Sequence, residues 1–314
     1  MSALQRLGIP NEWTAPAAGS SGAQAQTRDA FAFKWSKQDT YDAAHVQEAM
    51  RNWLLERYCG GDPARVDAWL AGDKKLIIDV GCGAGLSAML LFGNHLRDHD
   101  YLGIDISDAV HVARERFQQA GYRGDFLCSD LLEAPIRDES VDIIFSEGVL
   151  HHTDSTERAL KHLARKLVRG GLFLFYVYAR KARIREFTDD CIRESLRDMS
   201  DAEAWKALEP LTRLGVALGE LNVEIEIPEA IPYLGIPSGK MDLQRFIYWN
   251  ICKMYYRPGY SLDELNHINF DWFRPLNCHR QTPHEVRQWC HEASLGIEWM
   301  DIQEAGITVV AKRL

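Results

Sequence analysis

The stretch LIIDVGCGAG, residues 76–85, decides the fold of this chain. Its first half, LIIDV, is a short apolar run rich in β-branched side chains, which predicts a buried strand. Gly81, Gly83 and Gly85 follow at once, and glycine lets a backbone turn sharply and approach a ligand without interference from a Cβ atom. Asp79 stands two residues before the first glycine. The stretch therefore predicts a strand that ends in a ligand-binding turn.

The alternation of strands and helices continues on the carboxyl side of this turn. Strands are predicted over 101–106, 125–130, 141–148 and 172–178, and helices over 86–97, 108–120 and from Asp154 to the pair Gly170-Gly171. Near-continuous apolar strands separated by single helices predict an α/β fold with a doubly wound parallel sheet. After Tyr178 the alternation stops: 183–222 and 240–256 look helical, and 226–239 are broken by prolines. A further helix is predicted from the capping-box start Thr282-Pro283. Two strands, 297–303 and 307–313, then complete the sheet.

The amino-terminal side divides into two parts. Residues 14–28 are small and polar, with too few large apolar side chains to offset the entropy of ordering, so a flexible leader is predicted there. The segment FAFKWSKQDTY, residues 31–41, then concentrates aromatic residues ahead of an amphipathic helix. The apolar positions of that helix are Val46, Met50, Trp53, Leu54 and Tyr58.

Composition narrows the class of protein. The chain has 314 residues, a net charge of −9 and 46% hydrophobic residues, which is ordinary for a globular protein. No window approaches the roughly 18 uncharged apolar residues of a membrane span, so a cytoplasmic location is expected. The seven cysteines are scattered without a CxxC pair, and no tight set of metal ligands occurs, so we expect reduced cysteines and no metal. The acidic balance argues weakly against sequence-independent binding of nucleic acid and leaves a local basic patch open.

The glycine turn separates two families of nucleotide-binding protein. A nicotinamide site needs G-x-G-x-x-G, but the sixth position counted from Gly81 is Leu86. The spacing G-x-G-x-G, with Asp79 before it, resembles motif I of the class I S-adenosylmethionine-dependent methyltransferases. The resemblance continues through GIDIS, CSDLLEAP, SEGVLHHTDSTERAL and LVRGGLF, and covers 76–178 together with the final helix and hairpin. It implies a Rossmann-like, seven-stranded sheet whose last strand is antiparallel, and S-adenosylmethionine as cofactor, with S-adenosylhomocysteine as product.

The resemblance also implies the residues that bind the cofactor. Asp79 would lie near the methionine amino group, Asp105 would take the ribose hydroxyls, and Asp130 would bind the adenine amine beneath Leu131. The full implied set is Asp79, Gly81, Gly83, Gly85, Asp105, Ile106, Ser129, Asp130, Leu131, Ser146 and Glu147. The segment FAFKW is similar to methyltransferases whose first helix closes over the cofactor, which makes Phe33, Trp35 and Tyr41 candidates for a lid, although plain core packing explains them equally well.

The acceptor side is less defined. His151 and His152 follow the fourth strand, where a histidine could act as a base near neutral pH. The insertion should cap the acceptor pocket, and its aromatic cluster includes Tyr248 and Trp249. The stretch NFDWFRPLNCHRQTPHEV, residues 269–286, resembles the carboxyl-terminal region of bacterial methyltransferases. The substrate-side candidates are Tyr178, Tyr255, Tyr256, Arg257, Asp271, Trp272, Arg274, His279 and Arg280. The basic run Arg180, Lys181, Arg183 and Arg185 either steers an anionic substrate or is a solvated face.

Five segments and one principal function follow. The segments are a flexible leader (1–28), an amino-terminal lid with helices (29–72), the cofactor-binding core (73–179), a mainly helical substrate cap (180–270) and the end of the core (271–314). We expect methyl transfer to a small-molecule or biosynthetic-intermediate acceptor, with O- preferred over N- or C-methylation, by a monomer or homodimer. The alternatives are an NAD(P)-dependent oxidoreductase, a non-catalytic protein that binds the cofactor, and a methyltransferase for protein or RNA.

Overall fold

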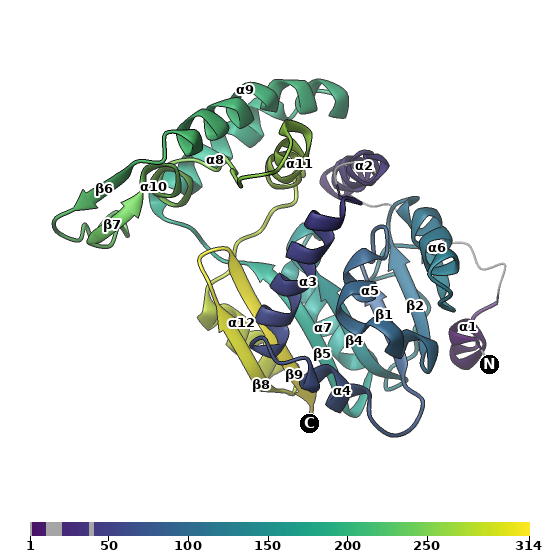
Figure 1. Cartoon of the computed structure of the whole chain (residues 1–314). Helices are drawn as coiled ribbons and strands as arrows, with labels where there is room; N and C mark the ends of the chain where they lie inside the picture. The colour runs from purple at the N-terminus through teal and green to yellow at the C-terminus, as the bar shows by residue number, and fades with distance from the viewer. Residues whose placement is uncertain (1, 11–20, 38–40) are drawn as a thin grey trace.

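The computed structural model describes residues 2–10, 21–37 and 41–314. Its main feature is a seven-stranded sheet with the strand order β3-β2-β1-β4-β5-β9-β8 (Figure 1). The strands are β1 (Leu76–Val80), β2 (Asp100–Asp105), β3 (Asp125–Cys128), β4 (Val141–Glu147), β5 (Leu167–Tyr178), β8 (Leu295–Ile302) and β9 (Gly306–Arg313). Strand β9 is antiparallel to both of its neighbours, and the remaining pairs are parallel. The predicted seven-stranded sheet with an antiparallel last strand is confirmed.

Helices cover both faces of this sheet, because successive side chains of a buried strand point to opposite faces. Ile77 packs with α3 (Ala44–Cys59), α5 (Leu86–Phe92) and α6 (Ala109–Gln119) in one core cluster. Its neighbour Ile78 packs in a second cluster on the opposite face. That face is covered by α1 (Ala3–Leu7), α7 (Thr156–Lys166) and α12 (Pro283–Glu292), while the short α4 (Ala64–Leu70) adds to the first face.

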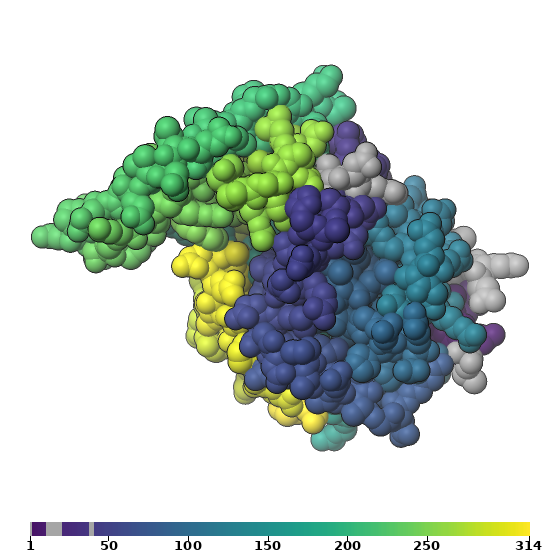
Figure 2. Space-filling model, viewed as in Figure 1, coloured from purple at the N-terminus to yellow at the C-terminus, as the bar shows by residue number. Residues whose placement is uncertain are grey.

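A helical layer lies over the carboxyl ends of the strands (Figure 1). It consists of α8 (Arg183–Leu196), α9 (Asp201–Glu220), the hairpin β6 (Glu224–Ile227) and β7 (Gly239–Asp242), α10 (Leu243–Asn250) and α11 (Leu262–Phe273). Buried polar contacts join α9 to α11: the Thr212 hydroxyl lies 2.6 Å from Asn266 Oδ1 and accepts from Asn269 Nδ2 at 2.9 Å. Figure 2 shows this layer projecting beyond the carboxyl-terminal strands. Among the described residues, no helix is long and apolar enough to cross a membrane.

The predicted flexible leader is wrong where the structure describes it. Residues 3–7 form α1, whose Leu4 and Leu7 are buried in the second core cluster, and α2 (Gly22–Ser36) begins well before Phe31. Composition missed α2 because its order comes from contacts with a distant loop: the Thr27 hydroxyl and the Gln24 side chain accept hydrogen bonds from Asn277. The part of the predicted leader at 11–20 lies outside the described residues.

Several element boundaries differ from the prediction. Helix α7 ends at Lys166 and β5 begins at Leu167, so Gly170-Gly171 lies within a strand. Gly171 is needed there because a Cβ would stand 2.9 Å from the Asp142 carbonyl oxygen of the neighbouring strand. The cap of α7 is Ser155, not Asp154, and its side chain accepts from the Arg158 amide.

Two further predicted helices are shorter than expected. The helix predicted over 86–97 changes to a 3-10 helix, η2 (Gly93–Arg97), at Gly93, whose positive φ of 53° interrupts the α-helix. The helix predicted over 240–256 is confined to α10, because 239–242 pair with 224–227 as the hairpin.

Candidate active site

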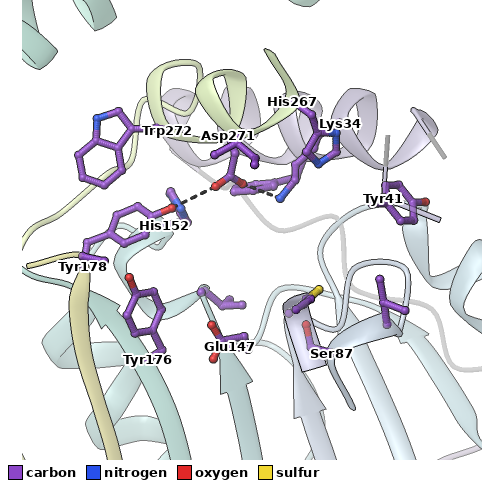
Figure 3. A pocket seen from close by; sticks show the side chains of 18 of the residues that line it. Lys34, Tyr41, Ser87, Glu147, His152, Tyr176, Tyr178, His267, Asp271 and Trp272 are labelled. Atoms are coloured by element: carbon purple, nitrogen blue, oxygen red, sulfur yellow. Dashed lines mark hydrogen bonds and ion pairs between the residues drawn. The ribbon is translucent and has the colours of Figure 1, made fainter. Parts of the chain in front are cut away.

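One cavity of about 580 Å³ lies between the carboxyl ends of the strands and the helical layer (Figure 3). Ten of the predicted cofactor and lid residues line it: Trp35, Tyr41, Asp79, Gly81, Asp105, Ile106, Ser129, Asp130, Leu131 and Glu147. Four others do not line it: Phe33, Gly83, Gly85 and Ser146. These ten come from α2, the residues after it and the ends of four strands, so the fold brings together groups that are far apart in the sequence.

Asp105 organises the glycine turn. It ends β2, and its Oδ2 accepts a hydrogen bond from the Gly83 amide at 2.8 Å. Its Oδ1 accepts from the amide of Ser107 at 2.8 Å and from the Ser107 hydroxyl at 2.6 Å. Burial raises the pKa of Asp105, and these hydrogen bonds oppose the rise. A carboxylate offers about four lone-pair sites, so Asp105 can still accept a hydrogen bond from a ligand hydroxyl.

Glycine is required at two positions of the turn. Gly81 has φ +75°, and a Cβ there would stand 2.2 Å from Val149 Cγ2. Gly83 has φ +50°, and a Cβ there would stand 2.6 Å from Cε2 of Trp35, whose indole lies against the turn. Such close approaches are possible only without a side chain. The turn is thus a backbone cradle with an aromatic ring above it.

Two buried carboxyl groups stand at the ends of β1 and β4. Asp79, 2% exposed, accepts a hydrogen bond from the Tyr101 hydroxyl at 2.7 Å, and burial raises its pKa to about 7. Glu147 accepts from the Tyr58 hydroxyl at 2.6 Å and from Arg57 Nη1 at 3.0 Å. Burial raises the pKa of Glu147, while the Arg57 charge opposes the rise. Both partners of Glu147 come from α3, and neither was predicted from the sequence as part of the site.

The lid candidates on and after α2 divide between two sides. Trp35 and Tyr41 pack edge to face at 5.3 Å, and the Tyr41 hydroxyl donates to the Trp35 carbonyl oxygen at 2.9 Å. Phe33 instead packs against Phe270 at 5.4 Å and Trp205 at 6.0 Å, between α2, α9 and α11. Phe33 is therefore a packing residue of the helical layer, because it projects from the face of α2 that meets this layer.

The two candidate bases have different surroundings. His151 is fully buried and does not line the cavity; its ring lies 3.8 Å from the Tyr178 ring, centroid to centroid. His152 lines the cavity, and its Nδ1 lies 2.6 Å from the Asn277 carbonyl oxygen, so Nδ1 carries the hydrogen. Its Nε2 is an acceptor with no hydrogen-bond partner among the residues that the structure describes. Burial lowers the pKa of His152 to about 4.

The predicted substrate-side residues are partly brought together. Tyr178, Tyr255, Arg257, Asp271 and Trp272 line the cavity, with Tyr248 and Trp249. Asp271 lies 2.5 Å from Lys34 Nζ and accepts from the Tyr178 hydroxyl at 3.1 Å (Figure 3). Burial raises the pKa of Asp271, but the Lys34 charge outweighs this and holds the pKa well below its usual range.

Four substrate-side residues have structural roles away from the cavity. His279 Nε2 lies 3.0 Å from the Thr153 carbonyl oxygen. The ring of Tyr256 packs directly against Gly219 of α9, so closely that a Cβ on this glycine would stand 2.1 Å from the ring. Arg274 donates to the Met199 carbonyl oxygen at 2.8 Å and pairs with Asp201 at 2.6 Å. Arg280 pairs with Glu186 and Asp190 at 2.7 and 2.8 Å.

The cavity also contains residues that sequence reasoning missed. They are Phe31, Lys34, Tyr176, Arg245, Lys253, Tyr260 and His267. Lys34 had a usable signal, since it is the one charged residue within FAFKW. Phe31 precedes it on α2, Tyr176 comes from β5, and the other four come from α10, α11 and the segment between these helices, where no local pattern distinguishes them. Among the described residues, no group of three or more His, Cys, Asp or Glu side chains could hold a metal.

Comparison with known proteins supports the same interpretation of the core. Residues 78–175 match the family described as "Methyltransferase domain". The probable tRNA methyltransferase 9B of Homo sapiens is 37% identical over 128 residues, which cover 39% of this chain and 26% of that protein. The tRNA (carboxymethyluridine(34)-5-O)-methyltransferase alkbh8 of Xenopus tropicalis is 36% identical over 124 residues, which cover 38% of this chain and 18% of that protein. The chain thus spans about a quarter or less of the length of these relatives.

Among the solved structures that the chain matches is the magnesium protoporphyrin IX methyltransferase (ChlM) of Synechocystis PCC 6803 with bound SAH. It is 14% identical, with a TM-score of 0.49 over 93% of this chain and 100% of that chain. The family match covers β1 to β5, including the glycine turn and the acids that follow it. Sheet order, glycine turn and family match together identify the core of this chain as a class I S-adenosylmethionine-dependent methyltransferase domain.

Proposed function

We propose that this chain transfers a methyl group from S-adenosylmethionine to a small organic acceptor, with a hydroxyl oxygen preferred over nitrogen or carbon. One observation carries the proposal: a single cavity is lined at one side by the cofactor-type residues of the strand ends and at the other by aromatic residues of the helical layer. A pocket that holds the methyl donor and the acceptor side by side makes their reaction effectively unimolecular. Such positioning is the main requirement of an in-line displacement.

The cofactor side fits S-adenosylmethionine by its chemistry. Asp105 would hold the ribose hydroxyls, Asp130 the adenine amine, and Leu131 and Ile106 the apolar faces of the base. Asp79 and Gly81 line the cavity, so the methionyl part would lie beside Asp79, whose carboxylate would attract the amino group. When bound, the cofactor supplies a methyl group on a positively charged sulfur.

The acceptor side supports positioning of a hydroxyl group. His152 presents a bare Nε2 in the cavity, which can accept the hydrogen bond of an incoming hydroxyl. A pKa of about 4 makes this ring a weak base, so its main contribution is to orient the nucleophile. The helical layer lies over one side of the cavity and would shield the reacting groups from water on that side.

Calorimetric titration of S-adenosylhomocysteine into the purified protein tests the cofactor side. We expect micromolar binding that falls at least about ten-fold in Asp105→Ala, because that variant loses charge-assisted hydrogen bonds. Asp108→Ala is the matched control, since Asp108 is exposed, three residues away and makes no side-chain cap hydrogen bond. Equal affinity of wild type and Asp105→Ala would contradict the proposed placement. A panel of phenols and alcohols, assayed for methyl transfer, then tests the preference for oxygen.

A tRNA acceptor is the second candidate. It is favoured by the two relatives named as tRNA methyltransferases, which are 37% and 36% identical to this chain over part of its length. The net charge of −9 disfavours it, because affinity for nucleic acid depends largely on Lys and Arg contacts to phosphate. Incubation with labelled S-adenosylmethionine and unfractionated tRNA decides: label in tRNA would replace the small-molecule proposal.

A further inference from the structure

Two lysines line the cavity beside Trp272. Lys181 follows β5 and Lys253 follows α10, and both line the cavity. Their Nζ atoms lie 5.4 Å and 4.9 Å from the centroid of the Trp272 ring. Figure 3 places Trp272 and Tyr178 across the cavity from Tyr41, which marks the cofactor side. The two ammonium groups therefore share one aromatic wall on the acceptor side.

Neither lysine forms an ion pair among the residues that the structure describes. Lys181 Nζ donates to the backbone carbonyl oxygens of Glu304 and Ala305, which carry no full charge. Lys253 is only 6% exposed, and its Nζ has no hydrogen-bond or ion-pair partner in the described part of the chain. An ammonium group on a largely buried side chain is costly when no anionic group pairs with it, so its presence at a cavity wall needs an explanation.

The acids near Lys253 are already engaged by other groups. Asp189 Oδ2 accepts from Arg185 Nε at 2.6 Å and from Trp272 Nε1 at 2.7 Å. Asp271 is held by Lys34 and the Tyr178 hydroxyl. Arg185, itself fully buried, adds a further positive charge to the same wall.

Burial and neighbouring cations lower the pKa of both lysines. Burial lowers the pKa of each to about 7; Arg185 lowers both and Lys253 lowers that of Lys181, while Asp271 opposes the fall for Lys253 and Glu186 for Lys181. An anion placed between them would reverse both effects, since it supplies the missing counter-charge and hydrogen-bond acceptors.

We propose that the acceptor carries an anionic oxygen group, a carboxylate or a phosphate, which binds to Lys181 and Lys253 beside Trp272. The rest of the acceptor would then lie against Tyr178 and Tyr176, toward His152. This inference rests on the proposed function, because it names the substrate class of the same site. The basic run at 180–185 thus contributes Lys181 and Arg185 to the cavity, while Arg180 and Arg183 are exposed.

The test uses three probes of similar shape on the full chain saturated with S-adenosylhomocysteine: benzoate, phenyl phosphate and the neutral benzamide. In calorimetric titrations, benzoate or phenyl phosphate should bind with a dissociation constant of about a millimolar or below. This affinity should be at least about ten-fold higher than that of benzamide. Preference for one of the two anions distinguishes an acceptor carboxylate from an acceptor phosphate. Lys253→Met, which keeps the aliphatic stem, should weaken anion binding by about ten-fold or more, and Lys253→Arg should retain it.

Lys240→Met on β7 is the matched control, because Lys240 is exposed and does not line the cavity. Affinity for S-adenosylhomocysteine, unchanged in Lys253→Met, shows that this variant is folded; if it is not, Lys181→Gln takes its place. The inference is overturned, while the proposed function stands, if the anions bind no tighter than benzamide. It is also overturned if they bind equally to wild type and to the variant used, Lys253→Met or Lys181→Gln. Wild type that fails to bind S-adenosylhomocysteine overturns the proposed function instead, and the anion titration is then read on the protein alone.

Discussion

At the scale of single residues, Asp79 links cofactor binding to pH. Burial raises its pKa to about 7. The hydrogen bond from Tyr101 opposes this rise, while the charges of Asp105 and Glu147 add to it. If the ionised form attracts the amino group of the ligand, affinity for S-adenosylhomocysteine should rise about ten-fold from pH 6 to pH 8. Calorimetry at the two pH values measures this, and Asp79→Asn should remove the dependence. An equal slope in the variant would assign the effect to another group.

The raised pKa of Asp79 also has a consequence for stability. The folded-state pKa lies above that of the unfolded chain, so the protonated form favours folding; this contribution is complete only below the unfolded-state pKa and is lost as pH rises from there to about 7. Asp79→Asn, which cannot ionise, should therefore be more stable than wild type at pH 8, by a margin that is clearly smaller at pH 5. Urea unfolding at both pH values measures the difference, and a variant less stable at pH 8 would contradict this account of the buried carboxyl group.

His152 is a second residue whose state can be measured without knowing the acceptor. Burial lowers its pKa to about 4, and the Asn277 carbonyl oxygen holds the hydrogen on Nδ1. Nitrogen-15 NMR should therefore show a neutral ring with a bare Nε2 at every pH above about 5. His152→Gln identifies the signal by its loss, and His284→Gln, at a position outside the cavity, serves as control. A ring that charges near pH 6.5 would contradict the described environment.

At the scale of elements, α2 separates binding from packing along one helix. Trp35 faces the glycine turn, whereas Phe33 packs between α9 and α11. Trp35→Ala should weaken S-adenosylhomocysteine binding, which Phe33→Ala should leave nearly unchanged because Phe33 does not line the cavity. Phe33→Ala should lower the free energy of unfolding by about 2 kcal/mol, because the side chain is partly buried. Calorimetry and urea unfolding of both variants measure the two effects, and the reverse assignment would show that Phe33 forms the lid.

At the scale of the whole molecule, Asn277 joins three distant segments. Its amide donates to the Thr27 hydroxyl at 3.1 Å, its side chain donates to Gln24 and Asp154 at 3.1 and 2.9 Å, and its carbonyl oxygen accepts from His152. Asn277→Asp would place a carboxylate against Asp154 and remove both side-chain donors. We expect a loss of about 2–4 kcal/mol in stability and faster amide exchange in α2. Exchange of α2 at the wild-type rate would show that other contacts hold this helix.

Local patterns were sufficient for the sheet and for the turn at its centre. Apolar runs such as LIIDV and the positive-φ glycines act through neighbours in the chain, so their meaning is present in the sequence. Element ends were less certain: Gly170-Gly171 resembles a helix stop, yet its backbone lies in β5 because pairing with β4 dominates. The capping box at Thr282, in contrast, depends on four consecutive residues and was predicted correctly.

The sequence alone determined the class of fold, the cofactor turn and the acids that follow each strand, because each depends on short-range spacing. Only the tertiary structure decided that α2 is ordered, that His152 and not His151 reaches the cavity, and that Lys181 and Lys253 meet at Trp272. These facts depend on contacts between segments far apart in the chain. Such contacts are set by how the helices pack on the sheet. The direction in which a side chain points within that packing cannot be read from the residues next to it in the sequence.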